Sequence, residues 1–143
     1  MSGPREQGDV SAGVEERIPK GLAVGELRGM LERHEPVTIL DIRPQSEREE
    51  WRIPGSIHRN AYDALRAGDQ SVLSDLAFPA DQPVVTVCGA GRTSEIAAAQ
   101  LRRRGIDAYS LIGGMKAWSL AWNTAELVAP RATLTQFRRT GKG

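Results

Sequence analysis

The feature that most constrains this chain is a short apolar run that leads directly into a glycine-rich loop and then into a helix-forming stretch. Residues 84–87 read Val-Val-Thr-Val after a proline, which predicts a buried β-strand. Residues 95–104 predict a helix that ends at Gly105, with a solvated basic run at 102–104 that complements the helix dipole. We expect its apolar stripe to comprise Ile96, Ala97, Ala99, Gln100 and Leu101. The loop between strand and helix, residues 88–94, reads Cys-Gly-Ala-Gly-Arg-Thr-Ser.

Strand patterns and helix patterns alternate along the rest of the chain. Helices are predicted at residues 25–33, 62–67 and 115–122, and strands at 37–41, within 54–58, and at 108–112. Such alternation predicts an α/β domain with a mainly parallel sheet.

The length of 143 residues predicts one compact domain. Residues 1–17 lack apolar periodicity, so we expect a disordered N-terminal tail there. We assign the domain to residues 18–125. Residues 126–143, which carry a strand-like alternation at 133–137, are interpreted as a C-terminal extension or a linker to a missing domain.

Composition excludes several classes of protein. One cysteine cannot form an intramolecular disulfide, and with His34 and His58 as the only histidines it cannot build a four-ligand Cys/His zinc site. A net charge of +1 argues against a nucleic-acid-binding surface. The chain has no apolar run near the ~18 residues of a membrane span, and no secretory signal. We therefore expect a cytoplasmic protein that binds neither nucleic acid nor membrane.

The loop at 88–94 is suited to activating a thiol. Cys88 follows the carboxyl end of a buried strand, where open α/β sheets bind their ligands. The two glycines let the backbone curl with its N–H groups inward, and the helix N-terminus near Ser94 directs further N–H groups to the same point. Such a cradle stabilises a thiolate. We therefore predict Cys88 as nucleophile, and as substrate-binding residues Gly89, Ala90, Gly91, Arg92, Thr93 and Ser94.

Structural interpretations compete with functional ones at other polar or aromatic positions. A cysteine after a strand is commonly a small buried apolar residue. His58 is interpreted as structural rather than as a base, and Asp41 with Arg43 as an ion pair or a set of loop hydrogen bonds rather than as catalytic groups. Trp118 and Trp122 are interpreted as an apolar core stripe rather than as a platform on which a substrate stacks.

Three ordered motifs carry a resemblance to a known family. Residues 41–44 read Asp-Ile-Arg-Pro and are followed by Ile-Pro-Gly-Ser-Ile at 53–57; the Cys88 loop comes second, and Gly-Gly-Met-Lys-Ala-Trp at 113–118 comes third. Over residues 18–123 this pattern resembles the rhodanese-like sulfurtransferases. The chain departs from the family at Trp51 and Arg52, where a Gly-His pair is usual.

The resemblance implies a three-layer α/β/α fold and transfer of a sulfane sulfur. By that resemblance Cys88 would carry a persulfide, and the N–H groups of residues 89–94 would hold the donor's anion, with no metal or organic cofactor. Thiosulfate, mercaptopyruvate or a low-molecular-weight persulfide would be the donor, and cyanide or a thiol the acceptor. Gly89 and Ala90 stand where thiosulfate-preferring members carry basic residues, so we expect weaker discrimination for thiosulfate.

Two alternatives remain open at this point. A phosphatase has a similar strand–loop–helix site but requires Cys-x5-Arg, whereas Ser94 occupies that arginine's position and Arg92 comes two residues earlier. The chain also fits a sulfur-carrier or regulatory module, fused to or acting with a metallo-β-lactamase-fold hydrolase.

Overall fold

The computed structural model describes residues 20–122. The strands are β1 (Gly21–Leu22), β2 (Thr38–Asp41), β3 (Ile57–His58), β4 (Val84–Val87) and β5 (Ala108–Leu111). The helices are α2 (Val24–Glu32), α3 (Gln45–Glu50), α4 (Tyr62–Arg66), α5 (Thr93–Arg103) and an unlabelled helix at residues 114–122. The predictions for residues 1–17 and 126–143 lie outside the described residues.

The five strands form one parallel sheet in the order β1-β5-β4-β2-β3. The predicted α/β class with a parallel sheet is therefore confirmed. β1 and α3 were not predicted from the sequence. β1 has two residues, and α3 buries none of its residues, so neither carries a hydrophobic period.

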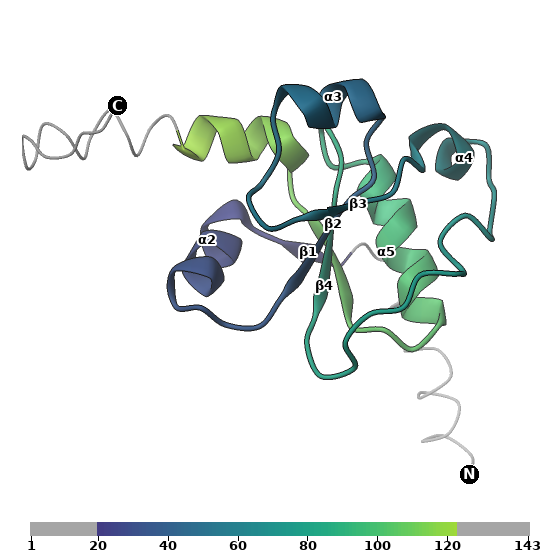
Figure 1. Cartoon of the computed structure of the whole chain (residues 1–143), viewed down its shortest axis with the longest axis horizontal. Helices are drawn as coiled ribbons and strands as arrows, with labels where there is room; N and C mark the ends of the chain where they lie inside the picture. The colour runs from purple at the N-terminus through teal and green to yellow at the C-terminus, as the bar shows by residue number, and fades with distance from the viewer. Residues whose placement is uncertain (1–19, 123–143) are drawn as a thin grey trace, which may run out of the picture.

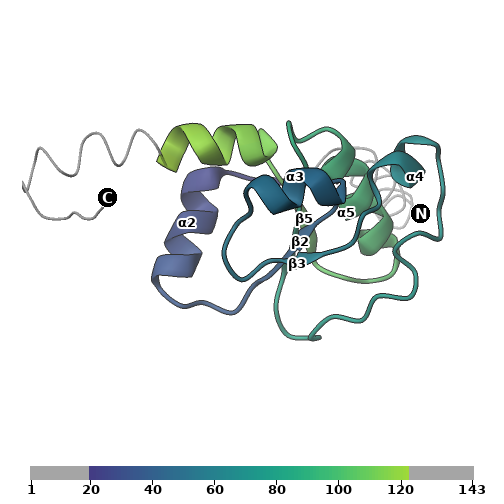
Figure 2. The ribbon, with the colours of Figure 1, turned by 45° about the horizontal axis from the view of Figure 1, so that its top comes forward.

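Helices cover both faces of the sheet, as Figures 1 and 2 show. Residues alternate between the faces along β4, because successive side chains of a strand point in opposite directions. Val84 belongs to the same buried cluster as Leu101 of α5 and Leu65 of α4, whereas Val85 and Val87 belong to the cluster on the other face. That second cluster contains Leu27 of α2. The arrangement is a three-layer α/β/α fold.

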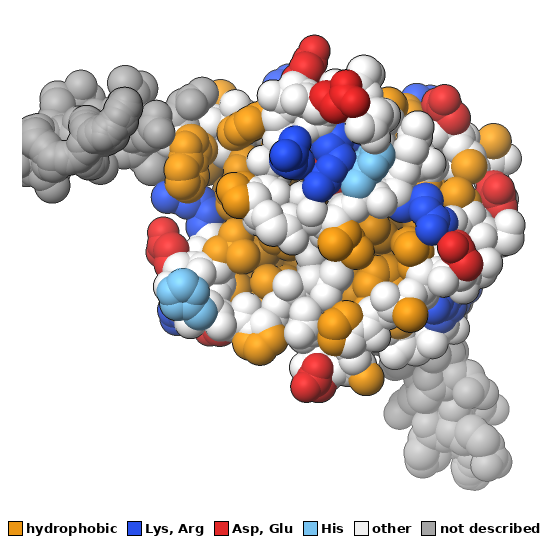
Figure 3. Space-filling model, in the orientation of Figure 1, with side chains coloured by type: hydrophobic (Ala, Val, Ile, Leu, Met, Phe, Trp, Pro, Cys, Tyr) orange, Lys and Arg blue, Asp and Glu red, His pale blue; other side chains and the backbone are white. Residues whose placement is uncertain are grey.

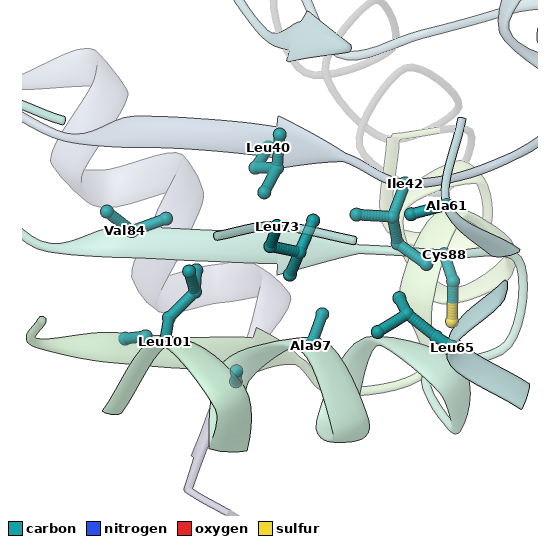
Figure 4. Close-up of a cluster of buried hydrophobic side chains, with 11 residues drawn as sticks. Leu40, Ile42, Ala61, Leu65, Leu73, Val84, Cys88, Ala97 and Leu101 are labelled. Carbon is teal, nitrogen blue, oxygen red and sulfur yellow. The ribbon is translucent and has the colours of Figure 1, made fainter. Parts of the chain in front are cut away.

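The cluster beneath α4 and α5 includes the loop cysteine. Figure 4 shows Cys88 at one end of this cluster, beside Leu65, Ala61 and Ile42. Burial of the cluster stabilises the fold by the hydrophobic effect, at about 25 cal/mol per Å² of apolar surface removed from water. Cys88 therefore packs at the end of the core.

The predicted apolar stripe of α5 was wrong in part. Ile96 is 39% exposed and Ala99 is partly exposed, whereas Ala98 is buried with Ala97 and Leu101. The helix begins at Thr93, and the loop fixes its rotation so that the positions 93–94, 97–98 and 100–101 face the sheet. The rotation of a helix about its axis decides which face it buries. The sequence does not specify this rotation for α5, because alanines occur on both of its sides.

The end of α5 agrees with its prediction in most respects. Gly105 adopts a φ of +88° and follows the helix as predicted, and Arg103 and Arg104 are exposed. Arg102 is partly buried and donates to the carbonyl of Ala108. Arg104 also donates to the carbonyls of Leu73 and Leu76, which holds that segment against the end of α5.

Within residues 20–122, no helix is both long and apolar enough to cross a lipid bilayer.

Candidate active site

The position of Cys88 follows from the alternation of side chains along β4. Thr86 and Cys88 lie on the face covered by α5, and both are buried. The hydroxyl of Thr86 donates to the carbonyl of Ser94 at 2.7 Å, which fixes the first turn of α5 over the strand. The chain thus leaves β4, turns through residues 88–92, and begins α5 directly above the sulfur.

Two backbone N–H groups of the loop point at the sulfur. The N–H of Gly91 donates to Cys88 Sγ at 3.1 Å, and the N–H of Ser94 donates to it at 3.3 Å. The side-chain oxygen of Ser94 lies 3.4 Å from the same sulfur. The two N–H groups donate to the sulfur, and the Ser94 hydroxyl oxygen accepts from its S–H. Of the N–H groups expected to face inward, those of Gly91 and Ser94 thus meet at the sulfur.

Gly91 is required by the shape of this loop. Its φ of +98° lies in a region that residues with a side chain rarely adopt, and that conformation turns its N–H inward. A Cβ at Gly91 would lie 2.8 Å from the backbone nitrogen of Gly113. The loop and the Gly113–Gly114 turn are therefore in direct contact.

The start of helix 114–122 holds the loop from the other side. The N–H groups of Met115 and Lys116 donate to the carbonyls of Cys88 and Gly89, each at 2.9 Å. A Cβ at Gly114 would overlap the Cys88 carbonyl oxygen and lie 2.8 Å from the carbonyl carbon of Gly89. Gly114 is thus needed for the close approach of the two segments, whereas a Cβ at Gly113 would meet Ala117 of the same helix.

The remaining predicted loop residues lie in different environments. Gly89 is partly exposed, Ala90 and Arg92 are exposed, and Thr93 is 5% exposed. The structure brings the polar groups of Gly91 and Ser94 onto the sulfur, whereas Arg92 points its charge to solvent. Position 94, where a phosphatase needs an arginine, is a buried serine.

Sequence reasoning missed Ser110 on β5. Its hydroxyl lies 2.7 Å from that of Ser94, and the residue is 2% exposed. A serine inside the apolar run 108–112 was the available signal, because a buried hydroxyl needs a hydrogen-bond partner.

Asp41 lies in a buried ion cluster at the end of β2. Arg43 binds both of its carboxylate oxygens, at 3.0 and 2.8 Å, and the Arg43 backbone N–H donates to it at 3.0 Å. Arg48 adds a bond at 3.3 Å. Burial raises the pKa of Asp41, but the hydrogen bonds and charge of Arg43, with the charge of Arg48, outweigh it and hold that pKa below its ordinary value. The predicted Asp41–Arg43 ion pair is confirmed.

The other interpretations concern His58 and the two tryptophans. His58 Nε2 lies 2.7 Å from the carbonyl oxygen of Arg43, which agrees with a structural role. Trp118 is buried, as a core residue should be, and stacks on Trp122 with ring centroids 6.3 Å apart. Trp122 is 42% exposed, so the predicted core stripe holds for Trp118 and is wrong for Trp122.

Trp122 lines a surface hollow together with Trp51, one of the two residues at which the sequence departs from the family pattern. Its volume is about 450 Å³, and its walls come from α2, the segment after α3 and helix 114–122. Figure 3 shows hydrophobic side chains gathered on this part of the surface. Trp51 also accepts a hydrogen bond at its carbonyl from Arg43, which ties the hollow's edge to the Asp41 cluster.

Among residues 20–122, no three His, Cys, Asp or Glu side chains are grouped so that they could hold a metal ion.

Comparisons with known proteins agree with this geometry. The family model described as the rhodanese-like domain matches residues 23–121. The chain is 33% identical over 106 residues to the thiosulfate sulfurtransferase GlpE of Pseudoalteromonas translucida, an alignment that covers 73% of this chain and 92% of that protein. It is 36% identical over 77 residues to the tRNA sulfurtransferase of Desulfurococcus amylolyticus, covering 54% of this chain and 14% of that protein.

A solved structure is similar as well. The crystal structure of a rhodanese-like domain protein from Staphylococcus aureus superposes with a TM-score of 0.56 at 29% sequence identity. The match covers 69% of this chain and 90% of that chain.

Proposed function

The chain belongs to the rhodanese-like domain family, and from that premise we propose that it is a sulfurtransferase that works through a persulfide on Cys88. Its relatives include proteins named as sulfurtransferases, which supports sulfur transfer as the class of reaction. The observation that carries the proposal is the convergence of the Gly91 and Ser94 N–H groups on Cys88 Sγ.

The proposed reaction has two steps that balance without an external oxidant. In the first, the Cys88 thiolate attacks the sulfane sulfur of the donor; a new S–S bond forms, the donor's bond to that sulfur breaks, and sulfite leaves with the electron pair when the donor is thiosulfate. In the second, cyanide or a thiolate attacks the outer sulfur, and Cys88 leaves as the thiolate. The loop N–H groups would stabilise the anion before and after each step.

The donor is proposed to be small, because Cys88 is 2% exposed and sits behind its own loop. Gly89 and Ala90 add no charge beside it, while the exposed Arg92 supplies a cation on the loop. We therefore keep thiosulfate, mercaptopyruvate and a low-molecular-weight persulfide as donors, with weak preference among them.

Mass spectrometry of the intact protein tests the proposal. The reduced chain is incubated in turn with thiosulfate, mercaptopyruvate and glutathione persulfide. We expect at least one donor to add the mass of one sulfur atom, and cyanide to remove it. Because the chain has a single cysteine, the added sulfur has one thiol to occupy.

Cys88→Ala is the variant that should gain no sulfur, and Ser56→Ala is a control in which a hydroxyl is removed away from the loop. Absence of the adduct from every donor, with the thiol shown to be reduced, contradicts the proposal. An adduct that also forms on Cys88→Ala would mean that the sulfur is bound elsewhere.

A second candidate is a carrier module that passes sulfur within a larger assembly. It is favoured by the tRNA sulfurtransferase match, in which the similar segment is 14% of a longer protein. A metallo-β-lactamase-fold hydrolase remains the partner to test. For a carrier, we expect transfer from loaded Cys88 to the partner's thiol or bound persulfide to be at least tenfold faster than transfer to cyanide.

A further inference from the structure

A chain of hydroxyl groups begins at the sulfur of Cys88 and runs away from the surface. Cys88 Sγ lies 3.4 Å from Ser94 Oγ, and Ser94 Oγ lies 2.7 Å from Ser110 Oγ. The three residues are 2%, 0% and 2% exposed. Because they are shielded from solvent, their hydroxyl groups must find partners among each other or in the backbone.

Gly91 closes this chain into a ring. Its N–H donates to Cys88 Sγ at 3.1 Å, and its carbonyl oxygen lies 3.5 Å from Ser110 Oγ. Each hydroxyl of the ring therefore has two neighbours, one on the side of the sulfur and one on the side of the carbonyl. A hydroxyl can donate to one neighbour while it accepts from the other.

The hydrogen bonds around this ring can run in either of two directions. With Cys88 as a thiol, its S–H donates to Ser94, Ser94 donates to Ser110, and Ser110 donates to the Gly91 carbonyl. With Cys88 as a thiolate, Ser94 turns its hydrogen onto the sulfur and Ser110 turns its hydrogen onto Ser94. Apart from the proton that leaves Cys88 on ionisation, the two states differ by the rotation of two hydroxyl hydrogens, with no movement of heavier atoms.

We propose that Ser110 is a positioning residue that reverses the Ser94 hydroxyl, so that Ser94 donates to the ionised sulfur of Cys88. In the reversed ring, the bond from Ser94 to sulfur is charge-assisted and is polarised further by the bond that Ser94 receives from Ser110. Without Ser110, the Ser94 oxygen would lose its donor in the buried site. Ser110 thus acts on the sulfur through Ser94.

This inference deepens the proposed function, on which it rests for its consequence in sulfur transfer. A persulfide carries its charge on the outer sulfur, so the ring acts on the unloaded thiolate that attacks the donor and that is released when the acceptor takes the sulfur. The ionisation of Cys88 itself, however, can be measured on the free protein without any donor. Failure of the relay and failure of sulfur transfer are therefore separate outcomes.

The test follows the ultraviolet absorbance of the thiolate against pH in the intact chain, with the curve of Cys88→Ala subtracted to remove the tyrosines. At a fixed pH below the midpoint, we expect Ser94→Ala to lower the thiolate fraction about tenfold. Ser110→Ala should lower it about threefold. The double variant Ser94→Ala/Ser110→Ala should match Ser94→Ala alone, because Ser110 has no other path to the sulfur.

Thr38→Val is the control. Thr38 has a hydroxyl that accepts from the Gln82 side chain, and it pairs with Val84, at the opposite end of β4 from Cys88. Its removal should leave the ionisation curve in place. An unchanged curve for Ser110→Ala, a double variant that multiplies the two single effects, or an equal shift in Thr38→Val would each overturn the proposal. Ser110→Ala removes one oxygen and adds no atom, so it creates no overlap in the core.

Discussion

Strands β2 and β4 lie side by side and end at the same edge of the sheet, where Asp41 pairs in register with Val87, the residue before Cys88. Asp41 and Cys88 are each 2% exposed. Asp41 is bound by the guanidinium groups of Arg43 and Arg48, whereas the groups that donate to Cys88 Sγ are neutral N–H groups of the loop.

The difference separates a structural group from the group that we propose to react. The Asp41 carboxylate has its charge compensated by cations that it also holds in place, so it contributes to folding and is not free to react. The Cys88 sulfur accepts hydrogen bonds from neutral N–H groups of the loop and is not paired with a cation. This sulfur is the nucleophile of the proposed reaction. The following predictions test this contrast, from the largest effect to the smallest.

Substituting Asp41 should mainly lower stability, whereas substituting Cys88 should mainly abolish sulfur transfer. Asp41→Asn should lower the free energy of unfolding by about 3 kcal/mol, because it leaves Arg43 buried without its counter-ion. The folded fraction should still accept sulfur at Cys88. Cys88→Ala should lose all sulfur transfer and change stability by about 1 kcal/mol. Urea unfolding and the mass-spectrometric sulfur assay measure the two quantities.

Asp75→Asn is the control for charge, since Asp75 pairs with Arg59 at an exposed site. We expect its unfolding midpoint to match that of the unmodified chain. The contrast fails if Asp41→Asn leaves stability unchanged while it abolishes sulfur uptake, since Asp41 would then belong to the chemistry.

Gly114→Ala should disturb the Cys88 loop more than the rest of the fold. The added Cβ meets the Cys88 and Gly89 backbone, so the loop must move. A displacement of about 1 Å would slow persulfide formation roughly a hundredfold, with a loss of stability of about 2 kcal/mol.

Gly68→Ala is matched to that variant, because Gly68 also has a positive φ, +90°, but an added Cβ there meets no atom within 4 Å. It should lose about 1 kcal/mol through backbone strain and keep its rate of sulfur uptake. Equal slowing of the two variants would contradict a specific role for the loop contact.

The acid stability of the chain should depend on Asp41. Its pKa is lower in the folded chain than in the unfolded one, so its contribution is complete above the ordinary value near ~4 and is lost as the pH falls through the folded value. The stability gap between the unmodified chain and Asp41→Asn should therefore shrink as the pH is lowered from about 6 to about 2. A gap that stays constant in urea titrations over this range would speak against the ion cluster.

Glu47→Gln should have the smallest effect, on donor choice. A carboxylate oxygen of Glu47 lies 3.9 Å from the position of a Cβ at Gly89, so its charge opposes an anionic donor at the loop. We expect kcat/KM for thiosulfate to rise about threefold at low ionic strength, and the gain to vanish in high salt. Glu49→Gln, on the same helix but paired with Gln45, should show no such gain.

Much of the fold could be predicted from short apolar runs. The strand 84–87 was predicted with its observed bounds, and helix α2 was displaced by one residue, because burial on a sheet or helix leaves a clear period. β1 and α3 leave no such period. The stripe of α5 was misplaced because its run of alanines carries little information about which side packs.

The candidate site likewise has a part that could be predicted from the sequence and a part that could not. The order strand, Cys88, glycines and helix was enough to predict a cradle of N–H groups, because that order dictates where the chain must turn. Ser110 could not be assigned to it, since it lies 22 positions along the chain from Cys88 and meets Ser94 through the pairing of β4 with β5. The surroundings of Trp51 likewise could not be predicted from the sequence: in the structure it lines a hollow together with Trp118 and Trp122.

The sequence by itself determined the class of fold and the family and singled out Cys88 as the candidate nucleophile, because these depend on local patterns of polarity and on residues adjacent in the chain. Tertiary structure decided which groups from other strands and helices surround the Cys88 loop: the hydroxyl of Ser110, the Gly113–Gly114 turn and the carboxylate of Glu47. Their proximity depends on strand order and helix rotation, which arise when distant segments bury their apolar faces together.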